Sequence, residues 1–215
     1  MQSSKLRTSW LAFLCAASLA QGQGTFHNLN FESANVAGYS TGGVPITNAL
    51  PGWQGYLGTF EISQVFYNTV SIGAAAISLQ GPGSTFTVLQ GSYTVFLQPQ
   101  FGGGGPLTPI PAIGQSGTVP ASAMSVRFYG FAGFAVSFAG QTIPISQLDT
   151  TPNYNIYGGD ISMFANQTGE LRFTGGGSLD MIHFSSQQIP EPSTLGFFAA
   201  GVLFLGWRLR GNPNL

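Results

Sequence analysis

Ser125-Val126-Arg127-Phe128-Tyr129 and Phe134-Ala135-Val136-Ser137-Phe138 alternate apolar and polar side chains with a period of two. This period is typical of half-buried β-strands. Ala139-Gly140 then supplies a turn into Thr142–Ile145, and Pro144 indicates that this second strand lies at a sheet edge, because proline has no N–H to donate to a neighbour. We therefore expect a β-hairpin over residues 134–145.

Similar runs recur along the chain. Apolar residues alternate with polar ones at Phe86 and Val88, at Tyr93, Val95 and Leu97, and at Leu171 and Phe173. Three glycine- or proline-rich stretches read as loops: Gly38–Pro51, Gln98–Pro120 and Gly175–Gly177. Short strands at this spacing predict an all-β fold, an antiparallel β-sandwich in one domain over residues 23–187.

Charge is scarce in this body. Its only cationic side chains are Arg127 and Arg172, against seven acids if Glu191 is included, which gives 2 minus 7, or −5. Binding to nucleic acid requires a basic surface that replaces counterions. We therefore expect no nucleic-acid partner.

The N-terminal segment has the three parts of a secretory signal peptide. Lys5 and Arg7 precede the apolar run Trp10–Ala17, and small residues near Ala20 suit cleavage. We assign residues 1–22 to this signal. The only cysteine, Cys15, lies within it, so a mature chain without thiols is expected.

The C-terminal segment begins with Pro190-Glu191-Pro192, which cannot lie inside a helix. An apolar run follows, and a helix over residues 194–209 would cover roughly 25 Å, near the short limit for a membrane span. Trp207, Arg208 and Arg210 are placed as interfacial and cytoplasmic membrane anchors. We therefore expect a transmembrane helix here.

This order of Pro-Glu-Pro, apolar helix and arginines resembles the PEP-CTERM sorting signal of Gram-negative, exopolysaccharide-making bacteria, over residues 188–212. The arginines are only two and are interrupted by Leu209, which departs from a basic cluster at the chain end. The resemblance implies processing by exosortase, a membrane cysteine transpeptidase. It also implies export through an inner-membrane intermediate to the outer cell surface or the extracellular matrix.

The body shows a second, weaker resemblance, to carbohydrate-binding or galactose-binding-like jelly rolls. It rests on the order of four segments: Asn28–Glu32, Leu50–Trp53, Asp160–Phe173 and Leu179–Ser185. In such domains an acid of the opening strand and one of the closing strand often meet and hold structural calcium. The resemblance thus implies a Ca²⁺ site at Glu32 and Asp180, whose oxygens suit this ion. The alternative is that Glu32 caps a turn and Asp180 binds backbone N–H groups.

Sugar binding is a further hypothesis, since aromatic rings stack on the apolar faces of sugars. Trp53 and Tyr56 are the candidate ligand-binding residues, and the alternative for Trp53 is a plug in the core.

No nucleophile elbow, metalloprotease helix or other specific catalytic arrangement is present in the sequence. We therefore expect a non-catalytic envelope or matrix protein with a structural or exopolysaccharide-associated role. The alternatives are a dedicated carbohydrate-binding module and, third, a glycoside hydrolase, whose carboxylates would come from Glu61, Asp149 or Asp160.

Overall fold

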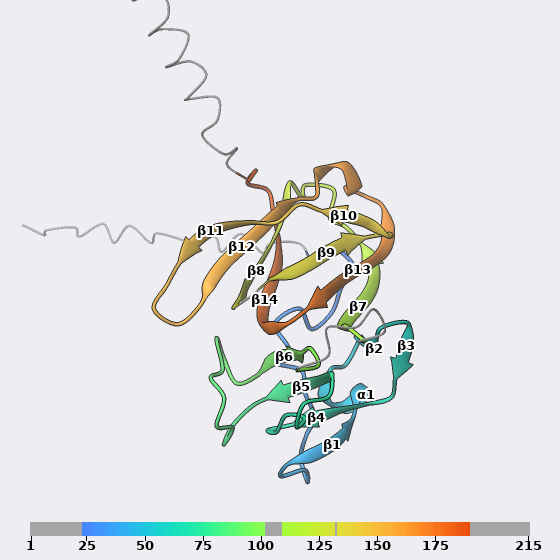
Figure 1. The fold of residues 1–215 in the computed structure, drawn as a ribbon. Helices are drawn as coiled ribbons and strands as arrows, with labels where there is room; N and C mark the ends of the chain where they lie inside the picture. Colours follow the sequence, from blue (N-terminus) through green and yellow to red (C-terminus); the bar gives the residue numbers. More distant parts are fainter. Residues whose placement is uncertain (1–22, 102–108, 132, 190–215) are drawn as a thin grey trace, which may run out of the picture.

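The computed structural model describes residues 23–101, 109–131 and 133–189. These residues form two β-sheets, with a single α-helical turn, α1 (Ile46–Ala49), and a 3₁₀ turn, η1 (Ser162–Phe164). Figure 1 shows β8, β9 and β11–β14 at one end of the molecule and β1, β4 and α1 at the other. The expected all-β sandwich is confirmed, and its two layers are consistent with a jelly roll.

Sheet A has eight strands, in the order β1-β4-β5-β6-β14-β8-β12-β11. Their bounds are β1 Gly42–Pro45, β4 Gln64–Tyr67, β5 Ala76–Gln80, β6 Thr94–Gln98, β14 Gly177–Ser185, β8 Ser125–Gly130, β12 Asn155–Asp160 and β11 Ser146–Thr150. Only β4 and β5 pair in parallel. In this order the last strand of the chain, β14, lies in the interior of the sheet, between β6 and β8.

Sheet B has six strands, in the order β10-β9-β13-β7-β2-β3, and all its pairs are antiparallel. Their bounds are β10 Gln141–Ile143, β9 Phe134–Phe138, β13 Thr168–Gly175, β7 Pro111–Thr118, β2 Gln54–Leu57 and β3 Phe60–Ile62. The predicted hairpin is confirmed as β9 and β10, and β10 lies at the sheet edge, as Pro144 indicated.

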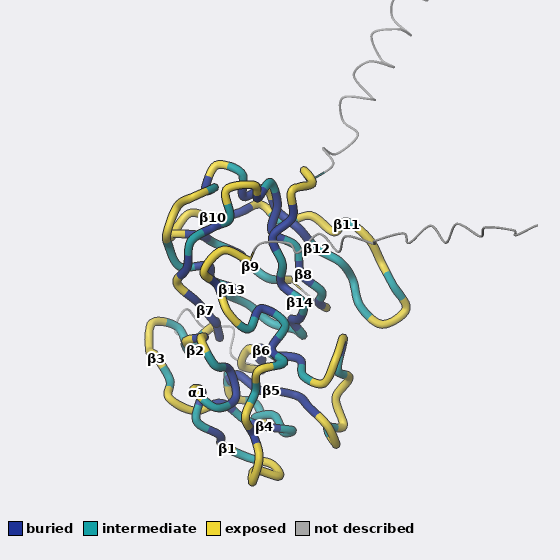
Figure 2. Tube along the Cα trace, turned by 180° about the vertical axis from the view of Figure 1, so that it is seen from behind, coloured by how far each residue is buried: buried dark blue, intermediate teal, exposed yellow. Residues whose placement is uncertain are grey.

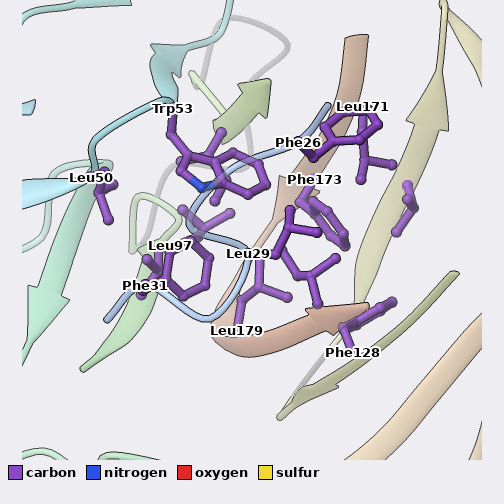
Figure 3. Close-up of a cluster of buried hydrophobic side chains, with 14 of the residues drawn as sticks. Phe26, Leu29, Phe31, Leu50, Trp53, Leu97, Phe128, Leu171, Phe173 and Leu179 are labelled. Carbon is purple, nitrogen blue, oxygen red and sulfur yellow. The ribbon is translucent and has the colours of Figure 1, made fainter. Parts of the chain in front are cut away.

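The core lies between the sheets and is built from the inward-facing side of the predicted alternation. Phe128 of β8 meets Phe173 of β13 edge-on, with ring centroids 5.2 Å apart. Figure 3 shows these rings together with Trp53 and the side chains of the opening segment. In Figure 2 the buried parts of the chain follow the strands, whereas the exposed parts lie mainly at turns and hairpin tips. Burial of one face of each strand therefore fixes the register of both sheets.

Two of the predicted loops are wrong in part. The stretch Gln98–Pro120 contains β7, which pairs with both β13 and β2 in the interior of sheet B. The stretch Gly38–Pro51 contains β1 and α1. In both, the glycines and prolines hid the strand, because they disfavour strands in general but do not prevent one where a neighbouring strand is available for pairing.

The strand predicted at Phe86 and Val88 is also wrong, because residues 81–93 form a loop. Phe86 is 40% exposed and stacks on Phe96 of β6 at 6.0 Å. Alternating threonines favour strands, but this segment has no strand beside it to accept its hydrogen bonds.

The opening segment, Asn28–Glu32, is likewise no strand, contrary to the resemblance. It forms turns, in which Asn28 and Phe31 have positive φ angles of 51° and 61°. Leu29 and Phe31 enter the core, and the Ile182 N–H of β14 donates to the Leu29 carbonyl at 2.9 Å. The opening and closing segments thus meet, but through one backbone bond instead of a ladder.

Within the described ranges, no helix is long and apolar enough to cross a membrane. The predicted signal peptide over 1–22 and the predicted membrane helix over 194–209, with Trp207, Arg208 and Arg210, lie outside those ranges, as does Pro190-Glu191-Pro192.

Candidate functional site

Glu32 and Asp180, the residues expected to hold calcium, both bind the loop between β5 and β6. Oε1 of Glu32 accepts the N–H groups of Ser92 at 2.8 Å and Tyr93 at 3.1 Å. Oδ2 of Asp180 accepts the Gln90 N–H at 3.2 Å and the Thr94 hydroxyl at 2.7 Å. Asp180 thus binds both ends of the segment from Gln90 to Thr94, and Glu32 binds its middle, as the alternative expectation described.

Calcium requires a shell of six to eight oxygen ligands, whereas these carboxylate oxygens face N–H and O–H donors. In the described part of the chain, no three His, Cys, Asp or Glu side chains form a group suited to a metal. The arrangement therefore does not fit a calcium cage as it stands, and calcium binding remains a prediction, which calorimetric titration of wild-type protein and Glu32→Ala would measure.

Asp180 is fully buried in the middle of sheet A. Burial raises the pKa of this carboxyl to about 7, although hydrogen bonds from Thr94, Met181 and Gln90 lower it. The nearby Glu32 carboxylate adds to this rise, and a pKa of about 7 is the net result. Asp180 therefore gains or loses its proton near neutral pH, and the segment that it holds is sensitive to that change.

Trp53, a candidate sugar-binding residue, is only 4% exposed. Its ring packs between Phe31 and Phe173, with centroids 5.6 and 6.4 Å away, and its Nε1–H donates to the Asn28 carbonyl at 3.0 Å (Figure 3). Trp53 thus presents no free face to a sugar at the surface. Its position is that of the core plug considered as the alternative.

Tyr56, the other candidate, lies on the outer face of sheet B in a polar cluster. The Arg172 guanidinium lies over the Tyr56 ring, 3.9 Å from its centroid, and approaches Glu170 at 3.6 Å. The Tyr56 hydroxyl lies 3.2 Å from Glu170 Oε1 and 3.1 Å from Gln54 Oε1. Gln54 in turn donates to Glu61 at 3.4 Å. We call Gln54, Tyr56, Glu61, Glu170 and Arg172 the Tyr56 cluster.

The Tyr56 cluster combines donors and acceptors on the solvent-facing side of sheet B. Such groups match the hydroxyls of a sugar, and the guanidinium supplies a fixed planar set of donors. Burial and the neighbouring Glu170 raise the pKa of the Tyr56 hydroxyl, so it remains a neutral donor at physiological pH. The sequence singled out Tyr56 but missed Gln54, because only the pairing of β2 with β3 brings it beside Glu61.

The three acids considered for glycoside hydrolysis lie on separate elements. Glu61 is in β3 of sheet B, whereas Asp149 and Asp160 are in β11 and β12 of sheet A. Asp149 pairs with Ile156 near the hairpin tip, and Asp160 pairs with Ser125 at the opposite end of β12.

A cavity of ≈ 150 Å³ is lined mainly by residues of β4 and β5. Its lining is apolar, with Leu57, Ile62, Phe66 and Ile77, and Gln64 provides a polar side chain. It therefore lacks the set of hydrogen-bonding groups that a sugar requires.

The chain leaves the sandwich along the outer face of sheet A. After β14 ends at Ser185, the Ser125 hydroxyl donates to the Gln187 carbonyl at 2.7 Å. Nη2 of Arg127 donates to the Gln188 carbonyl at 3.4 Å. Residues 188–210, which begin in this fastened segment, match the family model for the PEP-CTERM protein-sorting motif.

The chain carries a PEP-CTERM sorting motif. The match supports an exosortase substrate that is sorted to the cell surface, with exosortase as the processing partner. It also supports export with a transient stage at the membrane. The match does not cover the body: neither the curated proteins nor the solved structures include a match to this chain.

The sorting motif thus begins in a segment that two hydrogen bonds hold against the folded body. Both donors, Ser125 and Arg127, come from β8, which is held between β14 and β12 at the centre of one half of sheet A. The sequence identified the motif but not this contact, since it joins residues that are about 60 positions apart in the chain.

Proposed function

We propose that this protein is a non-catalytic component of the cell envelope or extracellular matrix, and that it is exported, processed by exosortase near Pro190-Glu191-Pro192 and then associated with exopolysaccharide. The observation that carries the proposal is the PEP-CTERM match at residues 188–210, directly after the last strand of a folded β-sandwich. The body is the part that remains after processing, and its surface makes the functional contacts.

The test of sorting is the intact mass and membrane partition of the full chain in an exosortase-bearing host and in a strain that lacks the enzyme. The expected result is a shortened species that ends near Pro192 only in the first strain. An uncut, membrane-bound chain in both strains would mean that the tail is a permanent anchor and that the proposal is wrong.

The Tyr56 cluster favours a more specific second candidate, a carbohydrate-binding module. Its net charge is one arginine against two glutamates, or −1, which suits a neutral, hydroxyl-rich polymer better than an anionic one. The cluster joins side chains of β2, β3 and β13, so its polar groups extend across neighbouring strands and could contact successive units of a chain. The protein would then bind matrix polysaccharide directly through sheet B.

Glycan arrays separate the two candidates. If the module proposal holds, the wild-type protein binds a neutral polysaccharide, and Tyr56→Ala or Arg172→Gln weakens binding at least about tenfold, the effect expected from the loss of one good polar contact. Tyr39→Ala is the matched control, because Tyr39 is an aromatic residue that is 38% exposed outside the cluster. Equal binding by all four proteins would exclude the Tyr56 cluster as the site. Release of reducing ends from the same glycans would instead support a hydrolase.

A further inference from the structure

The segment that follows the last strand, residues 186–189, lies against the body, and its last two residues are the first two of the sorting motif. The Gln187 N–H donates back to the Ser185 hydroxyl at 3.1 Å, which turns the chain as β14 ends. The carbonyls of Gln187 and Gln188 then accept from Ser125 and Arg127. Two consecutive carbonyls are thus held by side chains of one strand, β8.

The neighbouring strand, β12, provides a matching hollow. A Cβ atom placed on Gly158 would lie 2.8 Å from Cδ1 of Ile189 and 2.8 Å from Cδ1 of Leu148. Gly158 pairs directly with Arg127, so the hollow and the guanidinium lie side by side on the outer face of sheet A. Ile189 is half-buried there, although residues 186–188 are exposed.

The donors are positioned by contacts of their own. Ser125 is fully buried, and Nε of Arg127 donates to its hydroxyl oxygen at 3.2 Å. A buried hydroxyl that accepts one bond and donates another has a fixed orientation. The polar half of the site therefore exists as part of the sheet, and the missing side chain at Gly158 provides the apolar half.

We propose that Ser125, Arg127 and Gly158 form a docking site for residues 186–189, and that this docking sets the upstream limit of processing at the sorting motif. The second part rests on the proposed processing by exosortase. A peptidase must draw several residues on each side of the cut bond into its cleft in extended form. Docked residues cannot enter that cleft, so the cut falls after Ile189 and the mature body keeps the segment.

The first test measures docking without exosortase. Subtilisin has broad sequence specificity, so it reports on the bonds that follow Ser186, Gln187 and Gln188 in the detergent-solubilised full chain, and mass spectrometry follows the cut that leaves an end between Ser186 and Gln188. Gly158→Ala removes the hollow and is expected to speed this cut about tenfold, roughly the factor from one hydrogen bond and one partly buried side chain. Arg127→Gln should act in the same direction.

The control is Gly133→Ala, because a Cβ atom there would meet nothing within 4 Å. It should leave the cutting rate unchanged, and thermal unfolding should show that each variant body is folded. Equal rates for wild-type, Gly158→Ala and Arg127→Gln proteins would overturn the docking site.

The second test is the mature C-terminus in the exosortase-bearing host. Wild-type protein is expected to end beyond Ile189, and Gly158→Ala is expected to add species that end at Ile189 or further upstream. A wild-type end at or before Ile189 would refute the limit on processing. Absence of processing in every variant would refute the proposed function as well as this limit, while the subtilisin result would still decide whether the segment is docked.

Discussion

At the residue scale, Asp180 couples the fold to pH. Its carboxyl is buried, and its pKa is raised from 3.8 to about 7. Between these values the folded protein holds a proton that the unfolded chain has lost, so stability falls as pH rises through this window. Below pH of about 4 the carboxyl is protonated in both states, and above about 7 it is ionised in both. Outside this window the Asp180 carboxyl therefore does not change the free energy of unfolding as pH changes.

Asp180→Asn removes this titration. We expect the stability of the wild-type protein, relative to the variant, to fall by up to about 1.4 kcal/mol for each pH unit between roughly 4 and 7. Urea unfolding at several pH values measures the difference. A stability difference that is constant with pH would show that the Asp180 carboxyl is ionised throughout, with its hydrogen bonds from Gln90 and Thr94 outweighing burial.

Trp53 is the second residue with a defined contribution. Trp53→Phe removes the hydrogen bond to the Asn28 carbonyl and leaves space between Phe31 and Phe173. We expect a loss of about 1–3 kcal/mol in the free energy of unfolding, from the unmade bond and the cavity together. Chemical denaturation measures this loss. Unchanged stability would mean that the Trp53 ring does not plug the core. Glycan binding by the variant is expected to equal that of the wild-type protein.

At the scale of elements, β7 shows what periodicity misses. The strand reads Pro-Ala-Ile-Gly-Gln-Ser-Gly-Thr, so its side chains are small and only Ile113 is a large apolar residue. Neighbouring side chains occupy the space that they leave: Glu170 lies over Gly114, and the Phe26 ring lies over Gly117. A strand that receives its neighbours' side chains carries no alternation of its own, whereas β8 and β9, which supply core side chains, were predicted correctly.

Gly117→Ala tests this packing of β7. The added Cβ would lie 2.8 Å from the Phe26 ring, closer than van der Waals contact allows. We expect a destabilisation of about 1–3 kcal/mol, typical of overpacking. Gly133→Ala, at an open position, should change stability by less than about 0.5 kcal/mol. Equal melting temperatures for the two variants would show that Phe26 moves aside at little cost.

At the scale of the whole molecule, sorting and folding are separate properties. Replacing Pro190, Glu191 and Pro192 by alanine is expected to abolish processing in the exosortase-bearing host and to leave the unfolding of the body unchanged, because the hydrophobic core is built from residues between Phe26 and Phe184. Intact mass and thermal unfolding measure the two effects. Normal processing of the triple variant would show that exosortase reads another part of the chain.

The amino-acid sequence by itself determined the class of the fold, the edge position of β10 and the sorting motif, since each depends on neighbouring residues: a period of two, a turn with proline, and a run of about 20 residues. The tertiary structure alone decided that Trp53 is buried, that Tyr56 joins Glu170 and Arg172, that Glu32 and Asp180 hold one loop, and that Gly158 receives Ile189. These contacts join distant segments through strand pairing, and the order of strands in a sheet is not encoded in any local pattern.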